Sequence, residues 1–288
     1  MATGNITTGS LADSLPTVIS SAMVTREYEG VMPNLVDKKT LGEGIGLTWN
    51  EITLDALTAV AVTETTELDN PQQLADTLLS ITPTVIGVET FITDRVAARI
   101  SAIVYAQIGG QMQNAIQRKK DEDGLAMLDA ATTSLCGAGA TLTTGHLTAA
   151  KAQIAHYKGN APYYGVLHSY QEKDVADEIT AGVGAYAIPE GLTARVFESG
   201  VIGQVGGVTL FRDDNISIDT ADDAKGGVFA MEGIILVQGR SPRTVAVRRE
   251  NIGGGGTSIY QYDEYAYGER TAGYWLFEIY SDATAPTS

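Results

Sequence analysis

Residues 91–123 read FITDRVAARISAIVYAQIGGQMQNAIQRKKDED, with hydrophobic residues recurring at the spacing of one helix face. Thr93 is suited to be the N-cap, and the apolar positions that follow it four apart are Val96, Ile100, Val104, Ile108, Met112 and Ile116. The pattern predicts a helix from Asp94 to Lys120, about 40 Å long at about 1.5 Å per residue. Gly109 and Gly110 are expected to bend or loosen its middle.

The charges around this helix are sorted by sign. Between residues 95 and 120 every charge is positive, on Arg95, Arg99, Arg118, Lys119 and Lys120. Residues 40–94 hold nine carboxylates and no lysine or arginine. A basic helix that directly follows an acidic segment suggests that the two sets of charges serve contacts with a partner.

The bulk composition indicates a folded, acidic protein. The chain has 288 residues, 44% of them hydrophobic, which suffices for one large or two modest domains. Its net charge of −16 argues against tight nucleic-acid binding through a broadly basic surface. The single cysteine, Cys136, rules out an intrachain disulfide and is interpreted as a small buried hydrophobe. No run approaches the roughly 18 apolar residues of a membrane helix, and the N-terminus lacks the features of a signal peptide.

The segments before the helix are predicted to be extended. Residues 1–35 form an irregular arm with one weak helix between Ser10 and Tyr28. Residues 36–90 alternate apolar and polar positions on both sides of an acidic, turn-rich tip at 63–71, which predicts a long hairpin. Because an isolated hairpin is only marginally stable in water, we expect it to dock on something rather than to remain a solvated acidic flap.

The segments after the helix mix helices and strands and then become mostly β. Gly124–Leu135 predicts a short second helix, and Ser169 with Glu172 predicts a capping box that opens a helix to about Thr180. The aromatic residues between Tyr260 and Tyr280 are interpreted as one packed seam. The other predicted elements are a helix at 145–158, a strand at 164–168, a hairpin around Gly206 and Gly207, an apolar run at 227–237, and strands at 244–248, 258–267 and 274–280, the last with Trp275, Phe277 and Ile279 on one face.

No pattern of catalytic or ligand-binding residues stands out. Of the three histidines, His146 and His156 lie about 15 Å apart along one predicted helix, too far to share a metal. The loop at 253–256 lacks the lysine of a phosphate loop, and the segment that begins at Asp213 lacks the glycine and the closing glutamate of a calcium loop. We therefore predict no catalytic residue, no cofactor, no metal site and no enzymatic role.

Three stretches and their order resemble a known family. They are Leu147–Ala155 with Val166–Ser169, then Gly200–Leu210, then Tyr265–Trp275. Preceded by an arm, a long acidic hairpin and a long helix, they resemble the major capsid proteins of tailed double-stranded DNA phages, the Hong Kong 97-type fold. The resemblance covers essentially the whole chain.

This resemblance implies an α+β fold in four parts: an N-terminal arm at 1–35, an extended loop at 36–83, a peripheral domain with a spine helix at 84–136 and 239–288, and an axial domain at 137–238. It implies a structural protein that assembles into hexamers and pentamers of an icosahedral head shell around double-stranded DNA, in the virion after assembly in the host cytoplasm. The expected partners are further copies of the chain, a separate scaffolding protein, a portal, decoration proteins and packaged DNA contacted non-specifically. No membrane is expected.

A shell would also supply the partner for the sorted charges. We hypothesise that the acidic loop of one subunit docks near basic residues of the next, so that a single subunit leaves these charges idle. Each exposed pair would contribute only about 0–1 kcal/mol and would mainly set register. The candidate contact residues are Trp49, Glu64, Glu67 and Asp69 on the loop, and Arg95, Arg99, Arg118, Lys119, Lys120, Arg240, Arg243, Arg248 and Arg249 on its receptor. Because the loop has no lysine beyond Lys39, no covalent crosslink through a loop lysine is expected.

Two other functions remain open on the sequence alone. An encapsulin-type compartment would share the fold but enclose a cargo protein, and the contents of the particle would distinguish it. An acidic α+β binding domain or enzyme with an unrecognised site would instead remain a monomer or small oligomer in size-exclusion chromatography.

Overall fold

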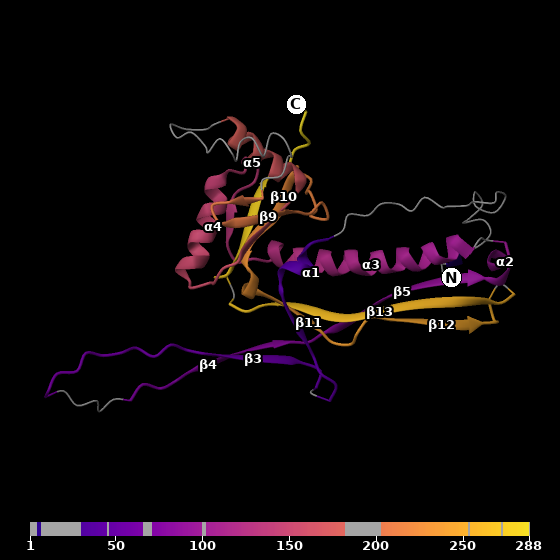
Figure 1. Cartoon of the computed structure of the whole chain (residues 1–288), viewed down its shortest axis with the longest axis horizontal. Helices are drawn as coiled ribbons and strands as arrows, with labels where there is room; N and C mark the ends of the chain where they lie inside the picture. The colour runs from indigo at the N-terminus through magenta and orange to yellow at the C-terminus, as the bar shows by residue number, and fades with distance from the viewer. Residues whose placement is uncertain are drawn as a thin grey trace.

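The structure is a computed structural model that describes residues 5–6, 30–44, 46–65, 71–99, 102–181, 203–252, 254–271 and 273–287. Figure 1 shows a long sheet with helix α3 lying along it, a compact lobe that carries α4 and α5, and a thin hairpin, β3–β4, that projects away from both. The predicted helix between Ser10 and Tyr28 lies outside the described residues. None of the helices that the structure describes has the length and apolar composition needed to cross a membrane.

The long helical segment is interrupted once. The short helix α2 (Asp94–Ala97) is capped by the hydroxyl of Thr93, as predicted. After a turn, α3 (Ala102–Asp129) continues through Gly109 and Gly110 without a break. The single helix predicted from 94 to 120 is therefore two helices, and the second extends nine residues beyond Lys120, from 121 to 129.

The predicted helix boundary at Gly124 is wrong, because Gly124 lies inside α3. A Cβ at this position would come within 2.9 Å of the Met32 Cβ and 3.1 Å of the Tyr267 Cζ. Glycine here permits close packing of the helix and does not end it. The remainder of the predicted second helix is a turn followed by strand β6 (Ser134–Cys136).

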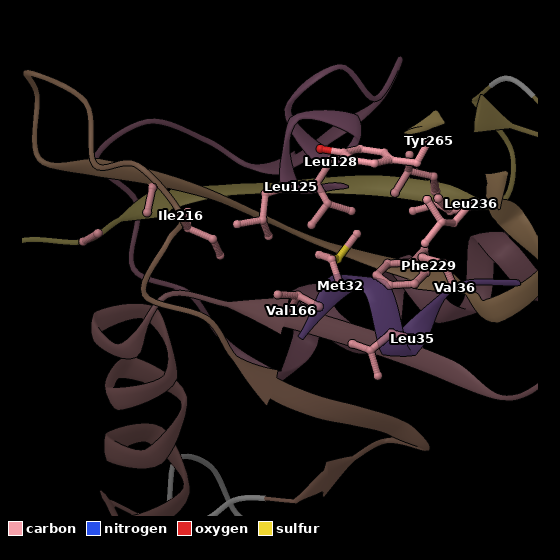
Figure 2. Packing of buried hydrophobic residues seen from close by; sticks show 14 residues of the cluster. Met32, Leu35, Val36, Leu125, Leu128, Val166, Ile216, Phe229, Leu236 and Tyr265 are labelled. Atoms are coloured by element: carbon pink, nitrogen blue, oxygen red, sulfur yellow. The ribbon is translucent and has the colours of Figure 1, made fainter. Parts of the chain in front are cut away.

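The apolar stripe of α2 and α3 faces the core where the structure describes its side chains. Val96, Met112 and Ile116 are all buried, which confirms that part of the prediction. Further along α3, Leu125 and Leu128 join a cluster with the short helix α1 (Met32–Leu35) and with strands of both sheets. Figure 2 shows this cluster, with Met32 of α1 among side chains of α3 and the strands.

The long sheet has the strand order β1-β5-β13-β11-β2, and β12 also pairs with β13. Strand β13 is the longest, and it pairs with β5 along one edge and with β11 and β12 along the other. One sheet face lies against α3, where Gln261 of β13 donates a hydrogen bond to Gln113. The strands are β1 (Asn5–Ile6), β2 (Asp37–Thr40), β5 (Thr84–Thr93), β11 (Ile234–Gln238), β12 (Arg243–Arg249) and β13 (Gly256–Glu269).

The compact lobe contains a second sheet with the order β6-β14-β10-β7-β9-β8. Its strands after β6 are β7 (Tyr163–Leu167), β8 (Gln204–Val205), β9 (Val208–Arg212), β10 (Asp223–Ala230) and β14 (Leu276–Asp282), and its helices are α4 (Thr144–His156) and α5 (Ser169–Ala181). These agree with the predicted helices, strand and hairpin. The capping interaction of α5 is one residue earlier than predicted, because the Gln171 side chain accepts the backbone N–H of His168 at 3.1 Å.

The β segments after residue 226 are divided between the two sheets. The apolar run 227–237 passes from β10 in the compact lobe, through a turn at Met231–Gly233, to β11 in the long sheet. Trp275, Phe277 and Ile279 all pack in the same cluster of the compact lobe, which confirms that they share one face, while Leu276 of β14 is buried in the other cluster. The aromatic residues from 260 to 280 therefore belong to two sheets and form no single seam.

The elements of the two sheets alternate along the chain. Strand β11 lies before residue 239 but belongs to the long sheet, whereas β6 and β14 belong to the compact lobe. The chain crosses between the long sheet and the compact lobe several times. As a result, strands that are distant in sequence pair with each other, such as β14 with β10 and β6.

Candidate inter-subunit surfaces

The β3–β4 hairpin exposes apolar side chains that the described part of its own chain does not cover. Strands β3 (Trp49–Leu54) and β4 (Asp76–Ile81) pair only with each other, in antiparallel register, which confirms the predicted hairpin. Beyond its root, the two segments of the hairpin extend side by side away from the rest of the molecule (Figure 1). Its large exposed apolar residues, each at least 49% exposed, are Leu47, Ile52, Leu54, Leu57, Val60, Val62, Leu74 and Leu78. A row of exposed apolar side chains of this kind is typical of an interaction surface.

The root of the hairpin is fixed to the long sheet. Trp49 is partly buried and packs against a cluster that contains Ile81, Ile235 and Val237. Its indole Nε1 is buried with no hydrogen-bond partner among the described residues. Trp49, predicted as an inter-subunit contact, thus already makes contacts within its own chain.

Arg270 is a site residue that the sequence did not single out. Its guanidinium lies 2.6 Å from the Asp37 carboxylate of β2 and 2.8 Å from the Glu51 carboxylate of β3, and it donates to the Glu232 carbonyl at 3.0 Å. Burial opposes ionisation of Asp37, but the hydrogen bonds from Arg270 and Lys39 lower its pKa below the ordinary value. Arg270 therefore ties the base of the hairpin to the sheet.

The three consecutive cations of α3 occupy different environments. Lys120 is buried, with its Nζ 3.2 Å from the Asp263 carboxylate and 2.6 Å from the Gln238 amide oxygen. Lys119 and Arg118 are more exposed and pair along the helix with Asp123 at 2.6 Å and Glu122 at 3.4 Å. The expectation that these charges are idle in one subunit is wrong, because acidic residues of the same chain pair with all three.

The arginines of β12 also have partners within the chain. Arg248 binds both oxygens of Asp94, at 2.7 and 3.1 Å, and these hydrogen bonds lower the pKa of Asp94. Arg249 pairs with Glu89 at 3.2 Å. Arg249 and Arg243 also lie over the stacked rings of Tyr260 and Tyr262, respectively, each 5.4 Å from a ring centre.

Four of the predicted basic contacts are exposed and make no ion pair with the described part of the chain. They are Arg95, Arg99, Arg240 and Arg243. On the acidic side, Glu64 lies exposed in the turn beyond the hairpin, while Glu67 and Asp69 lie outside the described residues. The structure of one subunit does not bring the predicted acidic and basic sets together, so their contact between subunits stays a prediction.

A buried carboxylate pair holds the start of α1 against α3. Asp121 accepts the backbone N–H of Met32 at 3.0 Å and the Asn215 side-chain amide at 2.9 Å. Asp213 accepts the backbone N–H of Val31 at 3.1 Å, and both carboxylates are 0% exposed. Burial and the neighbouring charge of Asp121 raise the pKa of Asp213 to about 7. Asp213, rejected above as a calcium ligand, instead joins three segments of the chain.

This pair predicts a specific pH dependence of stability. Because the folded-state pKa of Asp213 lies above its unfolded value, the folded chain retains a proton that the unfolded chain releases. Its contribution to stability is therefore full below about pH 4 and is lost as the pH rises to about 7. The free energy of unfolding in urea should therefore fall between about pH 4 and about pH 7 in the wild type, and it should fall less in Asp213→Asn. The expected difference between the two falls is a few kcal/mol, because one pKa unit corresponds to roughly 1.4 kcal/mol.

The slope of the unfolding free energy against pH tests the assignment, whereas the absolute stability of the variant does not. An asparagine amide nitrogen cannot accept a backbone N–H, so the variant also loses a hydrogen bond at every pH. An exposed control, Asp55→Asn, should keep the wild-type slope, because Asp55 lies exposed just after β3 and makes no ion pair with the described residues. Equal slopes for wild type and Asp213→Asn would contradict the assignment.

No family model matches the chain, and no curated protein matches it by sequence. Within the described residues, no group of three or more histidine, cysteine, aspartate or glutamate side chains is placed to bind a metal ion. The fold, in contrast, matches solved capsids. The capsid of cyanophage P-SCSP1u superimposes with a TM-score of 0.72 at 14% identity, over 97% of this chain and 96% of that one.

Two further structures give the same result. The capsid of Ralstonia phage GP4 has a TM-score of 0.72 at 12% identity, over 94% of this chain and 96% of its own. The structure from Mycobacterium phage Che8 has a TM-score of 0.71 at 15% identity, over 94% and 98%. The chain therefore has the fold of phage capsid proteins over nearly its whole length. In particular, this is the α+β fold of the Hong Kong 97 type predicted from the sequence.

Proposed function

We propose that this chain is the major capsid protein of a tailed double-stranded DNA phage. Its copies assemble into hexamers and pentamers of an icosahedral head shell that encloses the genome. The observation that carries the proposal is a capsid fold over nearly the whole chain, combined with a hairpin whose apolar side chains have no cover in one subunit. Such a hairpin is expected to lie on a neighbouring copy, because burying apolar area contributes about 25 cal/mol per Å².

Sheet membership suggests how the chain divides in the shell. The arm at 1–35 and the extended loop at 36–83 keep their predicted roles. The long sheet with α3 corresponds to the peripheral domain, and the compact lobe with α4 and α5 corresponds to the axial domain. Under this assignment β11 is peripheral, whereas β6 and β14 are axial.

The candidate electrostatic contacts between subunits can be narrowed. The exposed basic residues best suited to receive the acidic loop of a neighbour are Arg95, Arg99, Arg240 and Arg243, because the other candidates already form ion pairs within the chain. A scaffolding protein, a portal, decoration proteins and non-specific contact with packaged DNA complete the proposed set of partners. The role is structural, in a virion assembled in the host cytoplasm.

Electron microscopy of the purified full-length chain tests this function. Negative staining should reveal closed particles, or rings of five or six subunits, that sediment far ahead of a 30.4 kDa monomer. A protein that stays monomeric over a wide range of concentration and salt would contradict the proposal. Nuclease-protected DNA within particles would support a genome shell, whereas a protein cargo would indicate an encapsulin-type compartment.

A further inference from the structure

A cavity of about 560 Å³ lies between α1, β2 and the middle of α3. Leu236 and Gln238 of β11 form part of its wall. Its volume falls within the range of small-molecule sites, about 300–1,000 Å³. In Figure 1, α1 lies beside α3 at the end of the helix nearer the compact lobe. The cavity is thus separate from the exposed part of the hairpin.

The lining of this cavity is basic, although the chain has a net charge of −16. Four cations line it, Lys38 and Lys39 from β2 and Arg118 and Lys120 from α3, and no carboxylate does. Acidic partners of three of these cations, Asp37, Glu122 and Asp263, lie outside the lining. The fourth cation, Lys38, donates to the Asn34 side-chain oxygen at 3.1 Å.

One of these cations, Lys120, is held in position before any ligand arrives. Lys120 is 8% exposed, and its ammonium group is oriented by Gln238 and Asp263. Asn114, Gln117 and Thr40, which have neutral hydrogen-bonding side chains, also line the cavity. A site with preplaced donors loses less conformational entropy on binding, which favours affinity.

We propose that this cavity binds a phosphate group, carried either by a free polyphosphate or nucleotide or by the backbone of a nucleic acid. A phosphate presents three or more oxygens, and donors from α3, β2 and α1 approach the cavity from different sides. A guanidinium such as that of Arg118 binds phosphate in a bidentate manner, while lysines act as point charges. The inference does not rest on shell assembly, since binding to the cavity of a single subunit would suffice.

Two binding measurements on the purified full-length chain test this inference. Calorimetry with tripolyphosphate and fluorescence anisotropy with a short single-stranded oligonucleotide are made at about 50 mM salt, where phosphate contacts are strongest. Binding should be detectable, and Arg118→Gln should weaken it by about tenfold or more, as expected for lost hydrogen bonds between charged groups. The matched control is Lys119→Gln, which removes the same charge from the adjacent position outside the cavity lining.

The probes distinguish the source of the phosphate. Tight tripolyphosphate binding without oligonucleotide binding assigns a free phosphate ligand, and competition between the two assigns a nucleic-acid backbone. The inference is overturned if neither probe binds, if Lys119→Gln weakens binding as much as the cavity variant, or if a glutamate-rich peptide binds more tightly than both. Particle formation is scored separately, so failure of this site and failure of the shell proposal give different results.

Discussion

Lys120→Met is expected to lower the free energy of unfolding by about 3–5 kcal/mol, the usual consequence of removing one member of a buried ion pair. The variant leaves the Asp263 carboxylate, which is 2% exposed, without its cation. It also removes the hydrogen bond to Gln238 and the contact of the ammonium with the Tyr265 ring, 4.8 Å from its centre. Urea unfolding followed by circular dichroism measures the change.

The neighbouring residue provides the control. Lys119→Met should cost no more than about 0–1 kcal/mol, because the Lys119 side chain is 54% exposed and its pair with Asp123 is a surface pair. The double variant Lys120→Met with Asp263→Asn should recover part of the loss, since no buried charge is then left unpaired. Similar losses for the two single variants would show that Lys120 does not stabilise the fold in the way its burial indicates.

This contrast illustrates where prediction from the sequence ends. The helical spacing of Val96, Met112 and Ile116 identified one buried face, because periodicity is a local property. In the run 118–120, local sequence does not reveal which cation is buried. That depends on Asp263, which β13 carries to this point of α3 from 143 residues further along the chain.

The same reason accounts for the misplaced boundary at Gly124 and for the unrecognised role of Asp213. A glycine in a helical pattern usually suggests an end, but here it admits Met32 and Tyr267. Gly30 likewise lies so close to Asp121 that a Cβ would be 1.9 Å from its carboxyl carbon. In the sequence, Arg270 is a single basic residue among aromatic ones. Its role could not be predicted, because its two acidic partners lie more than 200 residues earlier in the chain. Order and spacing of elements predicted the capsid fold, whereas the individual long-range contacts were not predictable.

The exposed hairpin leads to the largest expected effect on assembly. Ile52 and Leu78 face each other across β3 and β4, and they are 61% and 60% exposed. In Ile52→Asp with Leu78→Asp, each subunit should fold with stability close to wild type, since exposed substitutions change it by about 0.5 kcal/mol or less. Shell formation should be lost, because each apolar side chain buried at a contact contributes about 1.5–3 kcal/mol and an unpaired carboxylate there is strongly unfavourable.

The adjacent cross-strand pair separates the apolar surface from the added charge. Thr53 and Thr77 are also exposed and lie opposite each other, but on the other face of the hairpin. Thr53→Asp with Thr77→Asp introduces the same two charges and should assemble much better than the apolar-face variant. Gradient sedimentation and electron microscopy measure particle yield, and circular dichroism verifies folding.

If the Ile52 and Leu78 variant forms particles at wild-type yield, this face of the hairpin is not buried between subunits, and its exposed apolar residues need another explanation. If both variants fail equally, added charge on either face is sufficient to prevent assembly, and the contact is not specific to the apolar face.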